Sequence, residues 1–297
     1  QDEGQYFTPI PITRFIWDSL PLDKILHTNE GYKLPKVIDY ACGAGHFLTE
    51  AVEAINTYFR HKDCAEQVEE NAWVEKCIYG IEKDYRLARV AKVCLHMNGA
   101  GKGQIIFGDG LEQYPEKGIT NGTFDILVAN PPYSVDAFKA HLKLKNNTFE
   151  ILPLISNTGS EIETLFVERI AQLLRPKGIA AVILPISILS NDSNSEIAAR
   201  EQILQNFNIR AIAQFGGKTF GATNTGTIVF FLEKYNEPPK RKEQIQDSVQ
   251  AILNDQISSD WEDKEIFDAY LQKIDVTEKD YKAFLNQRLS IEELKAI

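Results

Sequence analysis

An Asn-Pro-Pro-Tyr segment at residues 130–133 carries side chains well suited to chemistry in this 297-residue chain. It follows an apolar run at residues 124–129, so a buried strand is predicted to stop at two prolines. The Asn130 side-chain oxygen and the Pro131 carbonyl are both acceptors, and together they can bind both hydrogens of a planar amino group. Tyr133 offers an aromatic face to a flat ring. The segment predicts a site that grips an amino group, although paired prolines after a strand also begin ordinary loops.

Three other strand ends predict a cofactor site. Gly43 and Gly45 fall in the turn after the first predicted strand, where they let a ligand approach the backbone and the start of the next helix. Glu82 ends the second strand, where a carboxylate can accept both hydroxyl hydrogens of a ribose. Asp109 follows the third strand and is expected to accept from the amine of an adenine, with Leu111 against the ring. A phosphate-binding G-x-x-x-x-G-K-[ST] loop is missing, so the expected cofactor has an adenosine but no phosphate.

The elements that position these residues alternate between short apolar runs and amphipathic stretches, which is typical of parallel strands joined by helices. Strands are predicted at residues 37–40, 77–81, 104–107, 124–129, 179–184, 209–215 and 227–232, and helices at residues 47–59, 85–98, 161–174 and 196–206. Residues 61–76 are predicted to be a helical insertion, and residues 134–160 a mobile loop. The predicted fold is α/β: a doubly wound, mostly parallel seven-stranded sheet with an antiparallel edge strand. Residues 1–235 form this domain, and residues 236–297 form a polar, helical extension.

Composition narrows the class of protein. With 43% hydrophobic and 25% charged residues, no apolar run near the roughly 18 residues of a membrane span and no signal-peptide pattern, the chain is expected to be cytoplasmic. Its four isolated cysteines indicate neither a metal site nor a disulfide framework. A net charge of -10 argues against broad binding of nucleic acid by this chain alone. Because the sequence starts at Gln1 rather than Met, it is expected to be a piece of a longer protein.

Taken in order, the motifs resemble those of the DNA adenine-N6 methyltransferases of restriction-modification systems, most of all the modification subunits of type I systems. The matching segments are residues 5–9 (Gln-Tyr-Phe-Thr-Pro), 39–47, 130–133 and 215–227. The resemblance implies the cofactor S-adenosylmethionine, bound by Tyr6, Phe7, Thr8, Pro9, Asp39, Ala41, Cys42, Gly43, Gly45, Phe47, Glu82, Lys83, Asp109, Gly110, Leu111 and Asn130. It implies the catalytic residues Asn130, Pro131, Pro132, Tyr133 and Phe220, which would hold an adenine flipped out of DNA.

The resemblance also implies partners, because the sequence contains no evident module for recognising a DNA sequence and is acidic overall. A separate specificity subunit, or a segment missing from this chain, is expected to supply both DNA affinity and target choice, and a restriction subunit is a further candidate partner. This chain alone is expected to bind DNA weakly and with strong salt dependence. Two residues depart from the family pattern: Tyr40 stands where proline is more common, and His46 where a small residue is more common. Both substitutions are expected to change the wall of the pocket.

Several alternatives stay open at this stage. The same clamp can hold an amide or another exocyclic amine, so the chain could be a protein-glutamine or guanine-amino methyltransferase. It could also be a non-catalytic scaffold subunit, or part of a fused restriction-modification enzyme. At the level of residues, Asn130 could cap a loop, Glu82 could be a solvated strand-end carboxylate, and Phe220 could be a core aromatic.

Overall fold

The computed structural model describes residues 8–28, 31–62, 68, 71–99, 101, 103–216, 219–220, 226–237, 264–286, 290 and 293. The chain forms two compact units, Gln1–Pro238 and Pro239–Ile297, and each is described by itself. Within the described residues, no helix is both long enough and apolar enough to cross a membrane.

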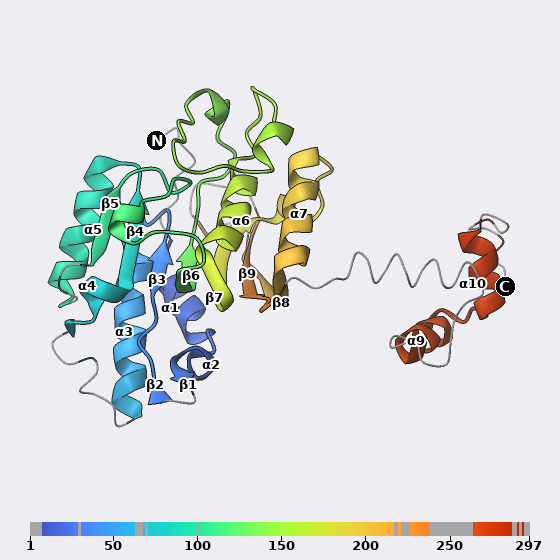
Figure 1. Cartoon of the computed structure of the whole chain (residues 1–297), viewed down its shortest axis with the longest axis horizontal. Helices are drawn as coiled ribbons and strands as arrows, with labels where there is room; N and C mark the ends of the chain where they lie inside the picture. The colour runs from blue at the N-terminus through green and yellow to red at the C-terminus, as the bar shows by residue number, and fades with distance from the viewer. Residues whose placement is uncertain are drawn as a thin grey trace. The chain divides into compact units, whose positions relative to one another are not determined.

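A single large sheet organises the described part of the first unit (Figure 1). Its strands are β3 (Val37–Asp39), β4 (Ile78–Glu82), β5 (Gln104–Phe107), β6 (Phe124–Ala129), β7 (Leu174–Pro185), β8 (Phe207–Gln214) and β9 (Thr227–Lys234), in the spatial order β5-β4-β3-β6-β7-β9-β8. Neighbouring strands from β5 to β7 are parallel, and β9 is antiparallel to both β7 and β8. The predicted mostly parallel seven-stranded sheet is confirmed.

The reversed strand lies inside the sheet and not at its edge. Strand β9 pairs with β7 through Ala181 and Phe231, and with β8 through Ala213 and Val229. Because β9 is antiparallel to both of its neighbours, the strand direction reverses twice across this part of the sheet. Edge strand β8 therefore runs in the same direction as the parallel strands, and β9 is the strand that turns back.

Helices cover both faces of the sheet. On one face lie α1 (Ile10–Asp18), α2 (Leu22–Leu26), α3 (His46–His61), α4 (Val74–Cys77) and α5 (Tyr85–Met97), and on the other lie α6 (Ile162–Leu173) and α7 (Asn194–Asn206). Strand β6 shows why: Ile126 and Val128 belong to the core under α3, whereas Leu127 and Ala129 belong to the core under α6. Alternate side chains of a strand point to opposite faces, so a strand buried on both faces is continuously apolar.

Shorter elements complete the first unit. They are the hairpin β1 (His27–Thr28) and β2 (Gly31–Tyr32), and the 3-10 turns η2 (Pro115–Lys117), η3 (Phe138–Ala140), η4 (Leu152–Leu154) and η5 (Ile186–Leu189). The sequence did not predict α1, α2 or this hairpin. The expected helix at residues 61–76 is present only as α4, and part of that segment lies outside the described residues.

The segment at residues 134–160, predicted to be a mobile loop, packs against the domain. It buries Phe138, Phe149, Ile151 and Ile155 in the core under α6. The carboxylate of Glu112 also accepts hydrogen bonds from two consecutive backbone amides of this segment, at 2.6 and 3.0 Å. Its apolar residues lack a regular period, so the sequence pattern gave no sign of this packing.

The second unit contains α9 (Lys264–Ile274) and α10 (Glu278–Leu285) among its described residues. Thr277 caps α10, since its hydroxyl accepts from the Asp280 amide at 3.2 Å. The Tyr281 ring lies 5.5 Å from Phe267 and 6.0 Å from Tyr270, which joins the two helices. The described residues of this unit are mostly helical, as the sequence predicted for the extension after residue 235.

Candidate active site

A cavity of about 410 Å³ opens at the carboxyl edge of the sheet, where β4, β5 and β6 end. Glu82, Asp109 and Asn130 stand on its wall. A smaller cavity of about 40 Å³ lies next to it, and the two cavities share Ala41, Gly43 and Asn130 as lining residues. The larger volume is within the range of small-molecule sites, and the carboxyl ends of parallel strands are where such sheets bind ligands.

The glycine loop after β3 is built to leave room for a ligand. Gly43 has φ +52°, and a Cβ placed on it would meet nothing within 4 Å. Gly45 has φ +86° and precedes the first residue of α3. The Asp39 carboxylate accepts from the Ala41 amide at 3.0 Å and so fixes the start of the turn. Both glycines adopt a backbone conformation that other residues rarely adopt, and Gly43 presents an open side.

Glu82 ties this loop to the next strand. One carboxylate oxygen accepts from the Gly43 amide at 2.8 Å, and the other accepts from the Asp84 amide at 2.7 Å. Each oxygen has a second lone pair, so both can still accept from a ligand. Burial raises the pKa of the neighbouring Asp39 well above its ordinary value; the Ala41 hydrogen bond opposes this shift, and the Glu82 charge adds to it. Two carboxylates thus line the two cavities at the ends of β3 and β4.

Asp109 occupies the third strand end, on the cavity wall beside Lys83. Its Oδ1 accepts from the Leu111 amide at 3.0 Å, and its Oδ2 lies 3.6 Å from the Lys83 ammonium group. Gly110 fits only as glycine, because a Cβ there would lie 2.1 Å from the Tyr40 carbonyl oxygen. Leu111 is buried at 1% exposure behind the wall, and it does not line the cavity.

Arg169 anchors the loop after β5, and the sequence did not predict this role. The side chain is fully buried in α6 and donates to the carbonyls of Gly110 at 3.3 Å and Glu112 at 2.7 Å. Its second terminal nitrogen donates to Asn121 and Gln172. Burial lowers the pKa of Arg169 to about 10, so the guanidinium stays charged at neutral pH. A charged residue in an amphipathic helix usually faces solvent, so the sequence did not predict that Arg169 is buried.

The N-terminal segment contacts the Asn-Pro-Pro-Tyr segment at this site. The Asn130 amide nitrogen donates to Thr8 Oγ1 at 3.2 Å, and the Thr8 carbonyl oxygen lies 3.3 Å from His46 Nδ1. Thr8 is buried at 8% exposure, and both it and Asn130 line the smaller cavity. Of the other predicted cofactor residues of this segment, Tyr6 and Phe7 lie outside the described residues, and Pro9 lines neither cavity.

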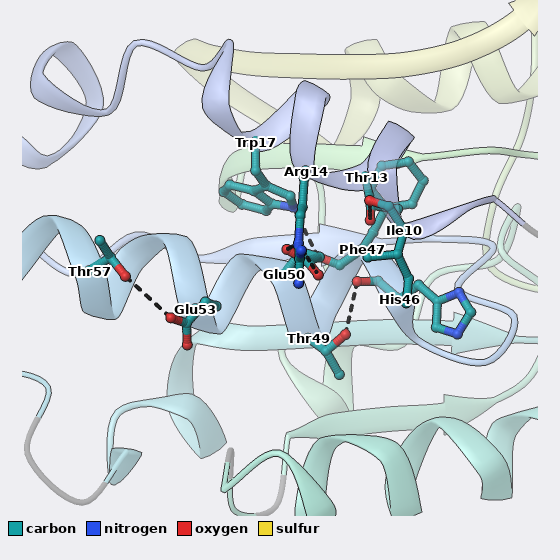
Figure 2. Close-up of polar contacts among 10 residues, drawn as sticks. All are labelled: Ile10, Thr13, Arg14, Trp17, His46, Phe47, Thr49, Glu50, Glu53 and Thr57. Carbon is teal, nitrogen blue, oxygen red and sulfur yellow. Dashed lines mark hydrogen bonds and ion pairs between the residues drawn. The ribbon is translucent and has the colours of Figure 1, made fainter.

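Helix α1, which follows Thr8 and Pro9, lies against α3 (Figure 2). The Trp17 indole donates to the Phe47 carbonyl at 2.9 Å, and Arg14 pairs with Glu50 at 3.3 Å. Thr49 also closes the first turn of α3 by donating to the His46 carbonyl at 3.0 Å. These contacts hold the start of the described chain next to the glycine loop.

The two aromatic residues predicted to hold the base, Tyr133 and Phe220, do not reach either cavity. Tyr133 is 2% exposed, and Phe220 is 9% exposed with its ring 5.9 Å from that of Phe215 in an edge-to-face contact. Neither lines the cavities, whereas Pro132 lines the larger one. Pro131 is buried. Stacking of a base on Tyr133 or Phe220 therefore stays a prediction.

Other lining residues were not predicted. The loop after Tyr133 contributes Val135, Asp136, Phe138, His141 and Leu142, and the helices contribute Leu87, Ile162 and Phe166. Tyr40, which was expected to change the wall of the pocket, also lines this cavity. Tyr40, which departs from the family pattern, is fully within the wall: its ring lies 5.0 Å from that of Phe166, and its hydroxyl donates to the Phe166 carbonyl at 3.3 Å. The sequence could have predicted the loop residues among them, because the loop directly follows the Asn-Pro-Pro-Tyr segment.

The chain has the fold of S-adenosylmethionine-dependent methyltransferases. This fold comprises the order of the seven strands and the reversed strand β9. The M protein of the type I restriction enzyme EcoKI superposes with a TM-score of 0.58 at 22% identity, over 78% of this chain and 44% of that chain. A Listeria monocytogenes protein provisionally named a class I S-adenosylmethionine-dependent methyltransferase superposes with a TM-score of 0.56 at 20% identity, over 81% of this chain and 65% of that chain.

The chain belongs to the N-6 DNA Methylase family, whose model matches residues 1–295. It is 26% identical over 248 residues to the type II restriction enzyme and methyltransferase RM.Eco57I of Escherichia coli, covering 68% of this chain and 25% of that protein. It is 26% identical over 250 residues to the type I restriction enzyme MjaVII methylase subunit of Methanocaldococcus jannaschii, covering 82% of this chain and 38% of that protein. The chain thus spans well under half the length of these relatives.

Proposed function

We propose that this chain carries the catalytic domain of a DNA adenine-N6 methyltransferase of a restriction-modification system. The observation that carries the proposal is the position of Asn130, at the end of β6 and on the shared wall of two cavities. Membership of the N-6 DNA Methylase family supports the same reaction. The family motif thus lies next to a pocket of suitable size for a cofactor.

The residues present fit S-adenosylmethionine. Glu82 and Asp109 offer carboxylate oxygens for a ribose and an adenine amine, and the open side of Gly43 leaves space against the backbone. Thr8 and Asp39 line the smaller cavity beyond Asn130 and offer polar contacts for the rest of the molecule. When bound, S-adenosylmethionine supplies an activated methyl group on a sulfonium.

The protein's own contribution is to hold the acceptor amine. A target adenine must leave the DNA stack before any residue can reach its amino group. Asn130 Oδ1 and the Pro131 carbonyl then accept the two amino hydrogens, which draws the nitrogen out of conjugation and directs its lone pair toward the methyl group. Because the Asn130 amide nitrogen donates to Thr8, the amide oxygen points the opposite way. The proton can leave after transfer, so no strong base is required.

We further propose that the chain acts as a type I modification subunit with a separate specificity subunit. The net charge of -10 supports a partner that supplies DNA affinity, since phosphate contacts by Lys and Arg provide most of that affinity. The named relatives include both a methylase subunit of a type I enzyme and a type II restriction enzyme and methyltransferase. Co-purification of the full-length protein with the subunit encoded beside it tests this choice.

The test of the reaction uses the full-length protein, its neighbouring subunits, labelled S-adenosylmethionine and DNA, with mass spectrometry to find the methylated base. Asn130→Ala should lower methyl transfer by at least about 100-fold, because one of the two acceptors of the clamp is lost. Asn208→Ala, at an exposed position on edge strand β8, is the matched control and should leave the rate unchanged. Label on guanine or on protein glutamine, or full activity of Asn130→Ala, would contradict the proposal.

A further inference from the structure

The turn that follows the catalytic motif is anchored by the first turn of α6. The Ser134 amide donates to Glu163 Oε2 at 3.1 Å, and the next amide, of Val135, donates to the Ser160 carbonyl at 3.0 Å. Ser134 also has φ +57°, a left-handed conformation that residues other than glycine rarely adopt. Such a conformation persists only when surrounding contacts hold it. Two consecutive hydrogen bonds to one helix start provide them.

Glu163 is an unusual residue for this place. Its side chain is buried, with 3% of the residue exposed, in a helix whose other buried positions are mostly apolar. Two further carboxylates act on it: Glu161 at the start of α6, and Glu196 on α7, which accepts from Ser193 at 2.7 Å and Asn191 at 3.0 Å. Like charges and burial both disfavour an ionised carboxylate. Stability alone would favour an apolar residue at this position.

We propose that Glu163 is a positioning residue, which keeps the Asn-Pro-Pro-Tyr turn in its amine-binding geometry by holding the amide of Ser134. The inference rests on the proposed function. The turn between Asn130 and Ser134 contains two prolines, whose rings fix φ and leave few free rotations. Fixing Ser134 at one end therefore restrains the Pro131 carbonyl and the Asn130 side chain at the other.

Ionisation of Glu163 should control how firmly the turn is held. Burial is the largest cause that raises the pKa of Glu163 to about 7, and the charges of Glu196 and Glu161 add to the rise. Hydrogen bonds from backbone amides, including the amide of Ser134, oppose this shift. Above that pH the Ser134 amide meets a full negative charge, and hydrogen bonds to ionised acceptors are roughly twice as strong as neutral ones. Methyl transfer should therefore fall as pH falls through 7.

The same helix offers a matched control. Glu168 is also buried, and its two carboxylate oxygens accept from the backbone amides of Glu150 at 2.8 Å and Ile151 at 3.0 Å. Burial raises its pKa as well. These hydrogen bonds hold residues 150 and 151 of the same loop, whereas the Ser134 amide donates to Glu163. Glu168→Gln thus removes the same kind of charge from the same helix without touching Ser134.

The experiment compares Glu163→Met, Glu163→Gln and Glu168→Gln in the full-length protein with its subunits. We measure single-turnover methyl transfer from pH 6 to pH 8.5, S-adenosylmethionine affinity, and hydrogen exchange at the Ser134 amide. Glu163→Met should slow transfer about 10- to 100-fold and speed Ser134 exchange by a similar factor, since the amide loses its partner. Glu163→Gln keeps an acceptor, so it should retain more activity but lose the pH dependence near 7. Glu168→Gln should keep the wild-type rate and profile.

A purely structural role predicts a different pattern. It would lower the melting temperature and cofactor affinity of Glu163→Met, whereas a positioning role leaves both close to wild type. A wild-type rate and pH profile in the Glu163 variants, or unchanged Ser134 exchange in Glu163→Met, would overturn the inference. If the wild type methylates a group other than adenine, the proposed function fails instead, and the same comparison on that acceptor still decides the role of Glu163.

Discussion

The amide nitrogen of Asn130 donates a hydrogen bond to the hydroxyl of Thr8 at 3.2 Å. The two residues are far apart in sequence, yet the contacts of α1 with α3 bring them together beside the smaller cavity. The contact orients the amide of the proposed amine clamp. Thr8, which the sequence assigned only to cofactor binding, is therefore also a hydrogen-bond partner of Asn130, the proposed amine-binding residue.

Replacing Thr8 by Val should slow methyl transfer about fivefold to tenfold, because one neutral hydrogen bond of about 1 kcal/mol that orients Asn130 is lost. Thr8→Ser keeps the hydroxyl and should restore most of the rate. Single-turnover kinetics together with calorimetric titration of S-adenosylmethionine separate the two roles of the residue. Equal rates for the Val and Ser variants would contradict an orienting role.

Gly43→Ala should abolish cofactor binding while keeping the fold. Both Gly43 and Gly122 have positive φ, at +52° and +67°, and a Cβ on either meets nothing within 4 Å. The two alanine variants therefore carry the same backbone strain of about 1 to 2 kcal/mol, but only Gly43 lines the cavities. Thermal unfolding should shift alike in both variants, and titration should show loss of affinity in Gly43→Ala alone. Wild-type affinity in Gly43→Ala would place the cofactor elsewhere.

Arg169→Met should destabilise the protein by about 3 kcal/mol, since the carbonyls of Gly110 and Glu112 lose their buried donor. For a domain of this size we expect the melting temperature to fall by roughly 6 to 12 °C. Arg210→Met is the control, because Arg210 makes an exposed ion pair with Glu233, and such pairs contribute about 1 kcal/mol or less. Similar losses in both variants would refute a special role for the buried guanidinium.

Stability should depend on pH through Glu163. Its pKa is raised from 4.5 to about 7 in the folded protein, so the folded state binds this proton more tightly than the unfolded state. The resulting stabilisation is fully present below pH 4.5 and is lost as pH rises through 7, by about 3 kcal/mol at most. Urea unfolding of wild type and Glu163→Gln at pH 5 and pH 8 measures the difference. A gap that does not change with pH would contradict the assignment.

The sequence predicted the parts of this fold in which local pattern and tertiary environment agree. Strands β5 and β6 have the predicted bounds, because apolar runs there end at Gly108 and at Pro131, residues that stop a strand. The ends of β4, β5 and β6 supplied Glu82, Asp109 and Asn130, which the structure brings to one cavity. Parallel strands force their carboxyl ends to one edge, so the order of motifs along the chain was sufficient to place them together.

Other features depend on contacts that no local pattern contains. Arg169 and Glu163 are charges in an amphipathic helix, and the sequence alone does not distinguish a buried charge with backbone partners from a solvated one. The packed loop at residues 134–160 is held by Glu112 and Glu168, which lie outside it. Phe220 was predicted to flank the base, but its burial beside Phe215 depends on the β8–β9 hairpin.

The reversed direction of β9 determines where the connection between β8 and β9 lies. Strand β8 ends at Gln214 and β9 begins at Thr227, so the connection between them starts and finishes at the same edge as Asn130. A hairpin connection can gain or lose residues without altering the register of the strands that flank it. This edge therefore combines the proposed amine clamp with a connection whose length can change without moving the strands on either side of it.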